Sequence, residues 1–305
     1  MDFGREMTGK DIANPIEALV SEVQKCSQRI EGVMPAAADR EADFTKEVER
    51  MGAFRGRPLF FNYISSGLGR GPYVQLKDGS VKLDLINGIG VHILGHSHPK
   101  MIKAGIEGAM QDVVNQGHLQ MGSEYTQMGE RLVAMAKGSR LKHCWLSTCG
   151  TMANENALKM ARQKNSPAKY VVAMENAFAG RSTMMAELTD NLNYKQGLPS
   201  YNEVLRVPFY DKFNPEKSKD AALQKMKENI DKHKGDIAAF CFEPMIGEGG
   251  YRVAQLDYYK PLFEECRKNN IAIWADEVQT FLRTGEAFAF QTLGFSDYVD
   301  LCSIA

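Results

Sequence analysis

The first segment that could bind a ligand runs from residue 149 to residue 155, with the sequence CGTMANE. It follows an apolar stretch and opens a helix-like one. Gly150 would let the backbone approach a ligand closely, and Thr151 offers a hydroxyl group and a backbone N–H. Because the N-terminus of a helix favours an anion, these residues have the physical outline of a phosphate site. An ordinary helix start capped by threonine fits the same residues and is the commoner case for such a segment alone.

A second segment, NAFAGR at residues 176–181, directly follows an apolar stretch. Phe178 could stack on a flat ring. Arg181 could bind a carboxylate through two parallel hydrogen bonds. A core phenylalanine and a surface arginine are the simpler interpretation of each residue taken alone.

Two carboxylates stand at the ends of apolar stretches. Glu243 precedes the glycine loop GEGG at residues 247–250, where a carboxylate is either structural or catalytic and the spacing does not decide between them. Asp276 ends the run IAIWA. A buried carboxylate is costly unless it is hydrogen-bonded or paired with a cation, and a protonated pyridine nitrogen would be such a cation. Gln279, three residues later, could hydrogen-bond a hydroxyl group of the same ring.

Two histidines, His96 and His98, stand two residues apart in the segment GHSHP. A metal site is possible, but no cluster of acidic or cysteine ligands lies nearby in the sequence. We therefore interpret the segment as a turn that leads into a helix, and we assign no metal ligand.

The elements that must position these residues follow an alternating pattern from about residue 100 onward. Apolar runs typical of buried strands alternate with amphipathic runs typical of helices, which predicts an α/β fold with a mostly parallel sheet flanked by helices. Ligands bind such sheets beyond the carboxyl ends of the strands. The expected strands are 143–147, 170–174, 203–207, 237–242, 271–275 and 301–305, and the expected helices are 100–114, 124–136, 152–163, 221–233 and 258–268.

The N-terminal part of the chain has a different character. Its first fifty residues are helix-like and rich in charge, which predicts a peripheral arm. The runs 72–76 and 81–85 flank the turn KDGS and predict a small antiparallel hairpin, whereas the glycines of 67–71 indicate an irregular loop. The sequence thus predicts an arm and hairpin segment over 1–98 and a large domain over 99–305.

Composition narrows the partners and the compartment. The chain has 37 Lys and Arg against 38 Asp and Glu, so neither a nucleic-acid partner nor a membrane surface is expected. Its six cysteines form no CxxC pair and are expected to be free thiols of a reducing compartment. No stretch has the length of a membrane span or the pattern of a signal peptide, so we expect a cytoplasmic protein.

Taken together, the segments resemble the class III aminotransferases, the ornithine and acetylornithine aminotransferase group of the fold type I pyridoxal 5′-phosphate (PLP) enzymes. The resemblance runs from Gly67 to Ala305. Each motif is weak alone, and the set is specific through its order and separation. The segments that carry the resemblance are GPYVQLKDG, NGIGVHILGHSHP, CGTMANENALKMAR, NAFAGR, FEPMIGEGG and WADEVQT.

The resemblance implies that PLP is the cofactor. It also implies that six residues line the PLP site and that one residue binds the substrate. A ring nitrogen kept protonated makes the PLP ring an electron sink. The implied roles are phosphate binding for Gly150 and Thr151, ring stacking for Phe178, pairing with the ring nitrogen for Asp276, contact with the phenolic oxygen for Gln279, lining of the site for Glu243, and binding of a substrate carboxylate for Arg181.

The sequence departs from the family pattern near these residues. Cys149 stands where a serine is usual, Ala179 replaces a frequent histidine or tryptophan, and Ile246 replaces a frequent glutamine. The stretch QTFLRTG at 279–285 is one residue short and lacks the usual glycines. These changes bear on substrate choice and loop geometry and leave Asp276 in place.

In this family, a lysine that binds PLP covalently follows a strand resembling DLCSIA at 300–305, and a small C-terminal domain completes the substrate pocket. The sequence ends at Ala305, so we assign no catalytic residue, and the 305-residue chain alone is expected not to transaminate. The complete protein is expected to be a homodimer that moves an amino group between an amino-acid or ω-amino donor and a 2-oxo acid.

Two alternatives stay open. A PLP-dependent aminomutase or decarboxylase of the same fold would use the same cofactor residues. A truncated paralogue without catalysis would bind PLP, or would pair with an intact subunit as its partner.

Overall fold

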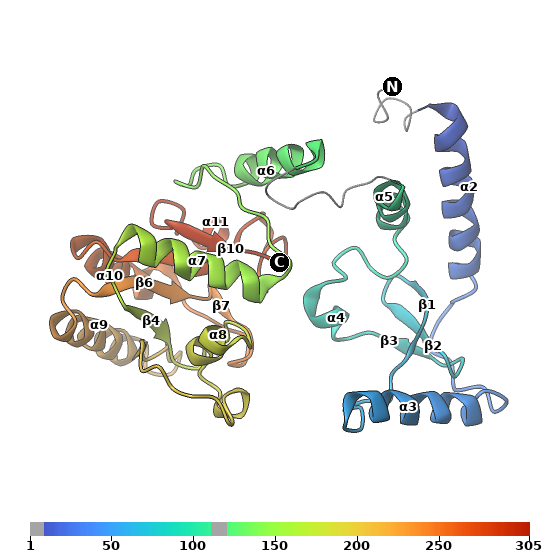
Figure 1. Ribbon diagram of the computed structural model, residues 1–305, viewed down its shortest axis with the longest axis horizontal. Coiled ribbons are helices and arrows are strands. Elements are labelled where there is room, and N and C mark those ends of the chain that lie inside the picture. Colours follow the sequence, from blue (N-terminus) through green and yellow to red (C-terminus); the bar gives the residue numbers. More distant parts are fainter. Residues whose placement is uncertain (1–8, 111–120) are drawn as a thin grey trace. The chain divides into compact units, whose positions relative to one another are not determined.

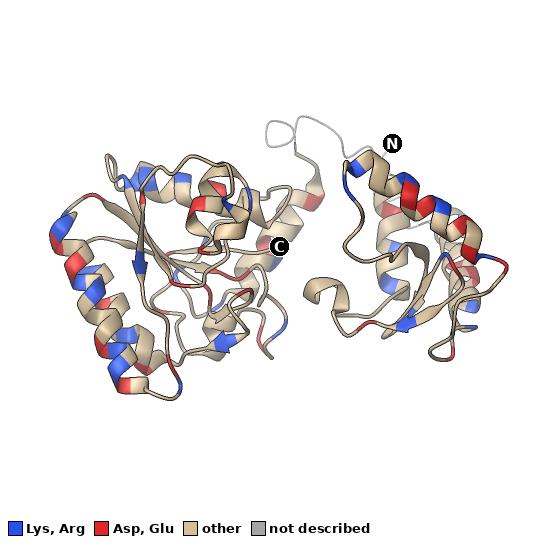
Figure 2. Cartoon of the chain, turned by 90° about the horizontal axis from the view of Figure 1, so that it is seen from below, with Lys and Arg blue, Asp and Glu red and all other residues tan. Residues whose placement is uncertain are grey.

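The computed structural model describes residues 9–110 and 121–305 and divides the chain into two compact units, Met1–Gly122 and Ser123–Ala305 (Figure 1). The division at residue 98 into an arm segment and a large domain stays a prediction. None of the described helices is both long enough and apolar enough to cross a membrane. Figure 2 shows Lys and Arg interspersed with Asp and Glu on the helices of both units.

The first unit consists of helices around a three-stranded antiparallel sheet with the order β1-β2-β3. The predicted hairpin is confirmed, because β2 and β3 pair antiparallel on either side of the KDGS turn. The last residues of the expected helix 100–114 lie outside the described residues. The elements are α2 (Lys10–Ser27), α3 (Glu41–Arg55), β1 (Ser65–Arg70), β2 (Tyr73–Leu76), β3 (Val81–Leu83), α4 (Asn87–Gly90) and α5 (Pro99–Ala109).

The glycine-rich run that we expected to be an irregular loop is instead strand β1, which pairs with β2 across an irregularity in register. The reason for its glycines is close packing. A Cβ atom on Gly69 would lie 2.5 Å from the Cβ of His96 and 2.6 Å from the carbonyl oxygen of Tyr73. A side chain cannot be accommodated at that distance, so glycine is required within the strand itself.

The second unit contains the predicted parallel sheet, with five strands in the order β10-β9-β6-β4-β5 (Figure 1). Most of the expected strands and helices are found within a few residues of the expected bounds. The strands are β4 (Tyr170–Met174), β5 (Val204–Val207), β6 (Ile237–Phe242), β9 (Ala272–Asp276) and β10 (Leu301–Ser303), with a short pair β7 (Met245–Ile246) and β8 (Arg252–Val253); the helices are α6 (Ser123–Met135), α7 (Gly150–Lys164), α8 (Thr183–Leu188), η1 (Leu192–Tyr194), α9 (Pro215–Lys232), α10 (Leu256–Lys268) and α11 (Ala289–Thr292).

Two hydrophobic clusters cover the two faces of this sheet. Successive strand residues alternate between the clusters, as the period of two in a β-strand requires. Phe240 and Phe242 pack with α9 and α10, whereas Cys241 and Trp274 pack with α7 and α8. Both faces are therefore buried, and this is why the strands read as continuous apolar runs in the sequence.

The expected strand at 143–147 is wrong. These residues form no strand, and the side chain of Trp145 is 55% exposed. An apolar run becomes a strand only where a neighbouring strand pairs with it, and β10 is the last strand of the sheet at its end of the order. The run instead leads as extended chain to the start of α7.

Glu277, directly after β9, fixes the loop that follows the sheet. It is fully buried, and its carboxylate accepts hydrogen bonds from the backbone N–H groups of Ala289 and Phe290, each at 2.7 Å, and from the hydroxyl of Thr280 at 2.8 Å. Its own N–H donates to the carbonyl of Ser303 on β10 at 2.8 Å. Glu277 thus joins α11, β9 and β10.

We expect Glu277→Ala to lower the free energy of unfolding by about 3 kcal/mol, because it leaves two buried N–H donors without an acceptor. Urea denaturation followed by circular dichroism measures the effect. Glu264→Ala, on the exposed side of α10, is the control and should change stability by less than about 0.5 kcal/mol. Equal effects of the two substitutions would contradict the role of Glu277.

Candidate active site at the strand ends

The N-terminus of α7 lies beside the carboxyl ends of the strands. Its first intrahelical bond runs from the N–H of Ala153 to the carbonyl of Cys149, so the amides of the preceding helical residues have no partner within the helix. Cys149 is extended and its side chain caps no amide. The helix therefore presents N–H groups and the positive end of its dipole at Gly150 and Thr151, as the phosphate interpretation requires.

Two glycines bring neighbouring loops onto this helix start. A Cβ atom on Gly150 would lie 2.8 Å from Cγ1 of Val278, and one on Gly180 would lie 2.6 Å from Oγ1 of Thr151. Gly180 also has a φ of +134°, which side chains rarely adopt. The loop after β9 can approach Gly150, and the loop after β4 can approach Thr151, only because Gly150 and Gly180 lack a side chain.

Asp276 ends β9 and is 5% exposed. Its Oδ1 accepts a hydrogen bond from the N–H of Val278 at 3.1 Å, and its Oδ2 accepts one from Nδ2 of Asn154 at 2.7 Å. The Asn154 amide also donates to the carbonyl of Ala179 at 2.8 Å. The carboxyl predicted from the sequence to be buried is therefore buried, and it is held by a residue of α7.

The sequence interpretation missed Asn154. Its signal was present, because Asn154, Ala157, Leu158 and Ala161 form the buried stripe of α7. A polar residue on the buried face of an amphipathic helix needs a hydrogen-bonding partner inside the protein. That partner, Asp276, is 122 residues away in the chain, so the sequence alone does not identify it.

Glu243, at the end of β6, joins two of the loops that carry candidate residues. Its Oε1 accepts from the N–H of Phe178 at 2.9 Å, and its Oε2 accepts from the N–H of Gly247 at 3.1 Å. Gln279 lies against the same glycine, since a Cβ atom on Gly247 would lie 1.9 Å from the Gln279 side-chain oxygen. The structure thus brings Phe178, Glu243 and Gln279 to one edge of the sheet.

Phe178 and Arg181 share one aromatic neighbour, Tyr194. The ring of Phe178 is half-buried and meets the ring of Tyr194 edge to face, with 5.4 Å between centroids. The Arg181 guanidinium is exposed and lies 5.9 Å from the centroid of the same tyrosine ring. Arg181 therefore stands at the solvent side of the group, farther out than Phe178.

Burial dominates the electrostatics of this edge. It raises the pKa of Asp276 to about 7 and that of Glu243 to about 8, and the charge of Asp276 adds to the rise at Glu243. Neither carboxyl forms an ion pair within residues 9–110 and 121–305. Two buried acids without a cation make this edge suited to a positively charged group.

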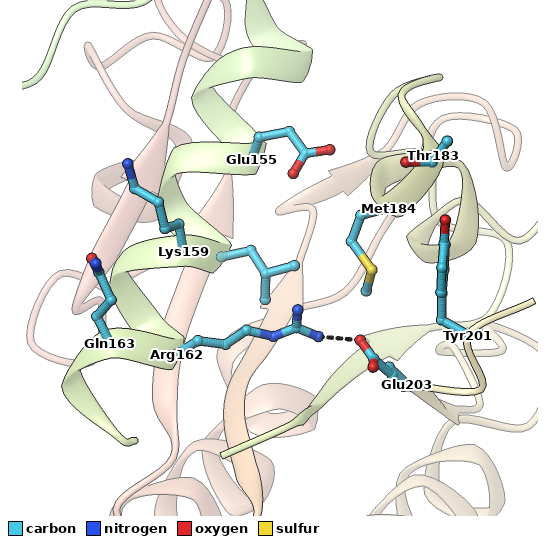
Figure 3. Close-up of a pocket in the computed structure, with 9 residues that line it drawn as sticks. Glu155, Lys159, Arg162, Gln163, Thr183, Met184, Tyr201 and Glu203 are labelled. Atoms are coloured by element: carbon cyan, nitrogen blue, oxygen red, sulfur yellow. Dashed lines mark hydrogen bonds and ion pairs between the residues drawn. The ribbon is translucent and has the colours of Figure 1, made fainter. Parts of the chain in front are cut away.

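The second unit contains two cavities, of which the smaller lies at this edge. One of about 170 Å³ is lined by Phe178, Asp190 and Glu248 together with the loop around Asn176. A larger one of about 370 Å³ lies on the flank of the sheet between α7, α8 and the start of β5 (Figure 3). Figure 3 shows the pair of Arg162 and Glu203, 2.7 Å apart, closing one end of it. None of the site residues predicted from the sequence lines the larger cavity. The larger cavity is therefore separate from the candidate active site.

The histidine segment lies in the first unit. His98 precedes α5 as its N-cap residue, which confirms the expected turn into a helix. His96 shares a hydrogen bond of 2.8 Å with Asp84, and its ring lies 4.2 Å from that of His92. Among the described residues, no group of three His, Cys, Asp or Glu side chains could hold a metal ion.

The α/β fold of this chain is shared with solved aminotransferase structures. Its structure superimposes on a lysine aminotransferase from M. tuberculosis with a TM-score of 0.74 at 23% identity, covering 85% of this chain and 65% of that chain. It also matches a transaminase from the marine bacterium Virgibacillus with a TM-score of 0.75 at 19% identity, covering 85% and 61%. At these identities, the likeness establishes the shared fold.

Sequence comparison identifies the family. Residues 59–305 match the model of the class-III aminotransferases, and the chain belongs to this family. It is 33% identical over 233 residues to the acetylornithine aminotransferase of Methanocaldococcus jannaschii, covering 74% of this chain and 54% of that protein. It is 34% identical over 246 residues to the 4-aminobutyrate aminotransferase of Mycobacterium leprae, covering 76% and 53%. The chain thus spans about half the length of these curated relatives.

The two raised pKa values predict how stability varies with pH. Asp276 and Glu243 keep their protons up to about pH 7 and about pH 8 when folded, but lose them near pH 4 when unfolded. The folded chain binds more protons in this window, so stability should fall as pH rises from about 4 to about 8. Urea midpoints at about pH 5 and about pH 8.5 measure the fall.

The variants Asp276→Asn and Glu243→Gln should each make this pH dependence shallower, because an amide does not titrate, although it keeps only one of the two accepted hydrogen bonds. Glu264→Gln on the exposed side of α10 serves as the control and should leave the slope unchanged. A slope that is the same in all four proteins would show that the buried acids do not cause it.

Proposed function

We propose that this chain forms the cofactor-binding part of a PLP-dependent transaminase. The whole protein would move an amino group between an amino-acid or ω-amino donor and a 2-oxo acid. One observation carries the proposal. Asp276 is a buried acid without a cationic partner in the described chain, and it is linked through Asn154 to a helix whose first turn has backbone N–H groups without a partner within the helix. Membership of the class-III family supports the same activity.

The residues present fit PLP at both of its charged ends. Gly150 and Thr151 offer the amides and hydroxyl that a phosphate binds, within a space that a Cβ atom on Gly150 or Gly180 would fill. The uncompensated carboxyl of Asp276 suits a protonated ring nitrogen. PLP bound there would supply an electron-accepting ring that stabilises the negative charge left when the substrate loses its α-proton.

The remaining residues would orient the cofactor and the substrate. Phe178, half-buried and held by Glu243, would stack on the ring, and Glu243 would line the site. Gln279, placed beside Gly247, would contact the phenolic oxygen. Arg181 would bind a substrate carboxylate, and its exposed position suits a group that arrives from solvent.

The amine that would carry PLP is not assigned among residues 1–305. It is expected directly after Ala305, at the end of β10, where the strand ends converge. We propose that a lysine at that position carries the cofactor. Sequencing the gene past the codon for Ala305 tests this part of the proposal, because a lysine codon is the expected result and another codon would contradict it.

Asp276→Asn should weaken PLP binding by about 100-fold, because an amide cannot stabilise the protonated ring nitrogen and a lost buried charge partner costs about 3 kcal/mol. Equilibrium dialysis with PLP measures the loss. For a reading frame that continues past Ala305, transfer of an amino group to 2-oxoglutarate should fall in parallel. Asp257→Asn, at an exposed aspartate in the first turn of α10, should bind PLP like the unmodified chain. Unchanged binding by Asp276→Asn would refute the proposed pairing.

We further propose that the protein is a homodimer that works in the cytoplasm. The first unit exposes a run of apolar side chains, and a contiguous apolar surface is typical of an interaction site. All six cysteines are free, as a reducing compartment maintains them. The exposed apolar residues of this run are Ile86, Ile89, Val91, Ile93 and Leu94.

Ile89 allows a specific test of the dimer. It has a φ of +62°, a conformation that asparagine tolerates better than a β-branched residue. Ile89→Asn should therefore leave the fold intact and shift the protein from dimer to monomer in sedimentation equilibrium. Phe213→Asn, at an exposed aromatic residue of the second unit, is the control and should remain dimeric. A monomeric unmodified protein, or a dimer that Ile89→Asn does not weaken, would contradict the proposal.

A further inference from the structure

Asn154 is a buried polar residue that is hydrogen-bonded to Asp276. It is 1% exposed, and it lies one helical turn after Thr151 on α7. Its Nδ2 donates to Oδ2 of Asp276 at 2.7 Å and to the carbonyl of Ala179 at 2.8 Å. Both hydrogens of the amide are therefore used, one on each of two segments that meet α7.

The orientation of this amide is determined by its partners. If the amide were turned over, its oxygen would face the Asp276 carboxylate and the Ala179 carbonyl, which are both acceptors. The observed orientation leaves Oδ1 of Asn154 without a hydrogen-bond partner in the structure, although it is buried. The buried oxygen of Asn154 is thus left without a hydrogen bond, while both N–H donors point at Asp276 and Ala179. A buried acceptor without a partner costs free energy, so we infer that the two donors have a function.

We propose that Asn154 is a positioning residue, which favours the ionised form of the Asp276 carboxyl group and holds it turned toward the ring nitrogen of the cofactor. This inference rests on the proposed function, since it assumes that Asp276 pairs with the ring. Asn154 occupies Oδ2 while the N–H of Val278 occupies Oδ1, so rotation of the carboxyl group would break one bond or the other. Each oxygen of Asp276 then keeps a lone pair for a ligand.

The charge of Asp276 depends on the same bond. A hydrogen bond donated to the ionised form favours that form, so Asn154 opposes the effect of burial on the Asp276 pKa. The titratable groups that act on or respond to this carboxyl are Glu277 beside it, Cys241 and Glu243 on β6 and at its end, and Cys302 on β10. The interactions with these groups disfavour charge, which leaves Asn154 as the side chain that favours it.

Two substitutions separate this role from simple packing. Asn154→Leu has nearly the same shape and removes the donors. Asn154→Asp keeps the size and places a second carboxyl against Asp276, so that the two acids must share a proton. In both variants, the pH at which Asp276 loses its proton should rise. Asn229→Leu is the matched control, because Asn229 is also a buried asparagine on a long helix and donates to the carbonyl of Arg206 at 3.2 Å.

The experiment uses the 305-residue chain labelled with ¹³C at the aspartate carboxyl carbon, with Asp276→Asn identifying the resonance. The titration midpoint of Asp276 is measured by NMR without cofactor, and the dissociation constant of PLP is measured by dialysis over the same pH range. We expect Asn154→Leu to raise the midpoint by about one pH unit and to move the pH at which PLP binding is lost upward by a similar amount. The Asn229→Leu control should show neither change, even where its stability falls.

The outcomes distinguish the inference from the proposed function. A higher Asp276 midpoint in Asn154→Leu and Asn154→Asp, with normal behaviour of Asn229→Leu, supports the positioning role. An unchanged midpoint in both variants overturns it, whether or not PLP binds. If the midpoint rises in the free chain but the unmodified chain binds no PLP at any pH, the proposed function fails and the part of the inference that concerns the ring nitrogen fails with it. Should Asn154→Leu not fold, Asn154→Ala removes the same donors without adding a charge and provides the same test.

Discussion

The burial of the Asp276 carboxyl is the constraint on which the arrangement of the strand ends depends. Three acids stand at this edge, and they accept different numbers of hydrogen bonds. Glu277 accepts three hydrogen bonds from the loop and helix that follow it, although burial raises its pKa as well. Glu243 and Asp276 each accept two, at depths where burial raises their pKa values to about 8 and about 7. Glu277 thus receives one hydrogen bond more than either of the other two acids, which are left to gain from a nearby cation. That difference separates the structural acid from the candidate functional ones more clearly than burial does.

Close contact between backbones makes this arrangement possible. The helix start at Gly150, the loop at Gly180 and the loop at Gly247 meet neighbours at distances where a side chain would overlap them. Gly180 lets the loop after β4 reach the strand ends, and Gly247 does the same for the loop after β6. Gly150 lets the start of α7 lie against the loop after β9. Because hydrogen bonds to Asp276 and Glu243 span these loops, small shifts in one loop change the environment of the acids held by the others.

Much of the second unit could be predicted from the sequence, because the patterns that indicate its strands and helices are local. Strand β6 was expected at its observed bounds since six successive apolar residues need two covered faces, and Asp276 was expected to be buried because it ends such a run. The errors have a common origin in contacts that are distant in the chain. The run at 143–147 has strand-like residues but no paired neighbour, and β1 was taken for a loop because its glycines serve close packing against His96. Asn154 and Glu277 were missed because their partners lie far along the chain or on the backbone, where residue identity carries no signal.

The spacing of Thr151 and Asn154 suggests how this edge tolerates change around it. The two residues are three positions apart, so one turn of α7 carries both the proposed phosphate-binding residue and the donor to Asp276 on the same face. In the proposed function, the distance between the phosphate and the ring nitrogen would then be determined by one turn of a helix. The positions that depart from the family pattern, Cys149, Ala179 and Ile246, lie before this turn or in the loops that meet it. Substitutions at such positions leave the helix that carries Thr151 and Asn154 unchanged, so the proposed cofactor site does not depend on them.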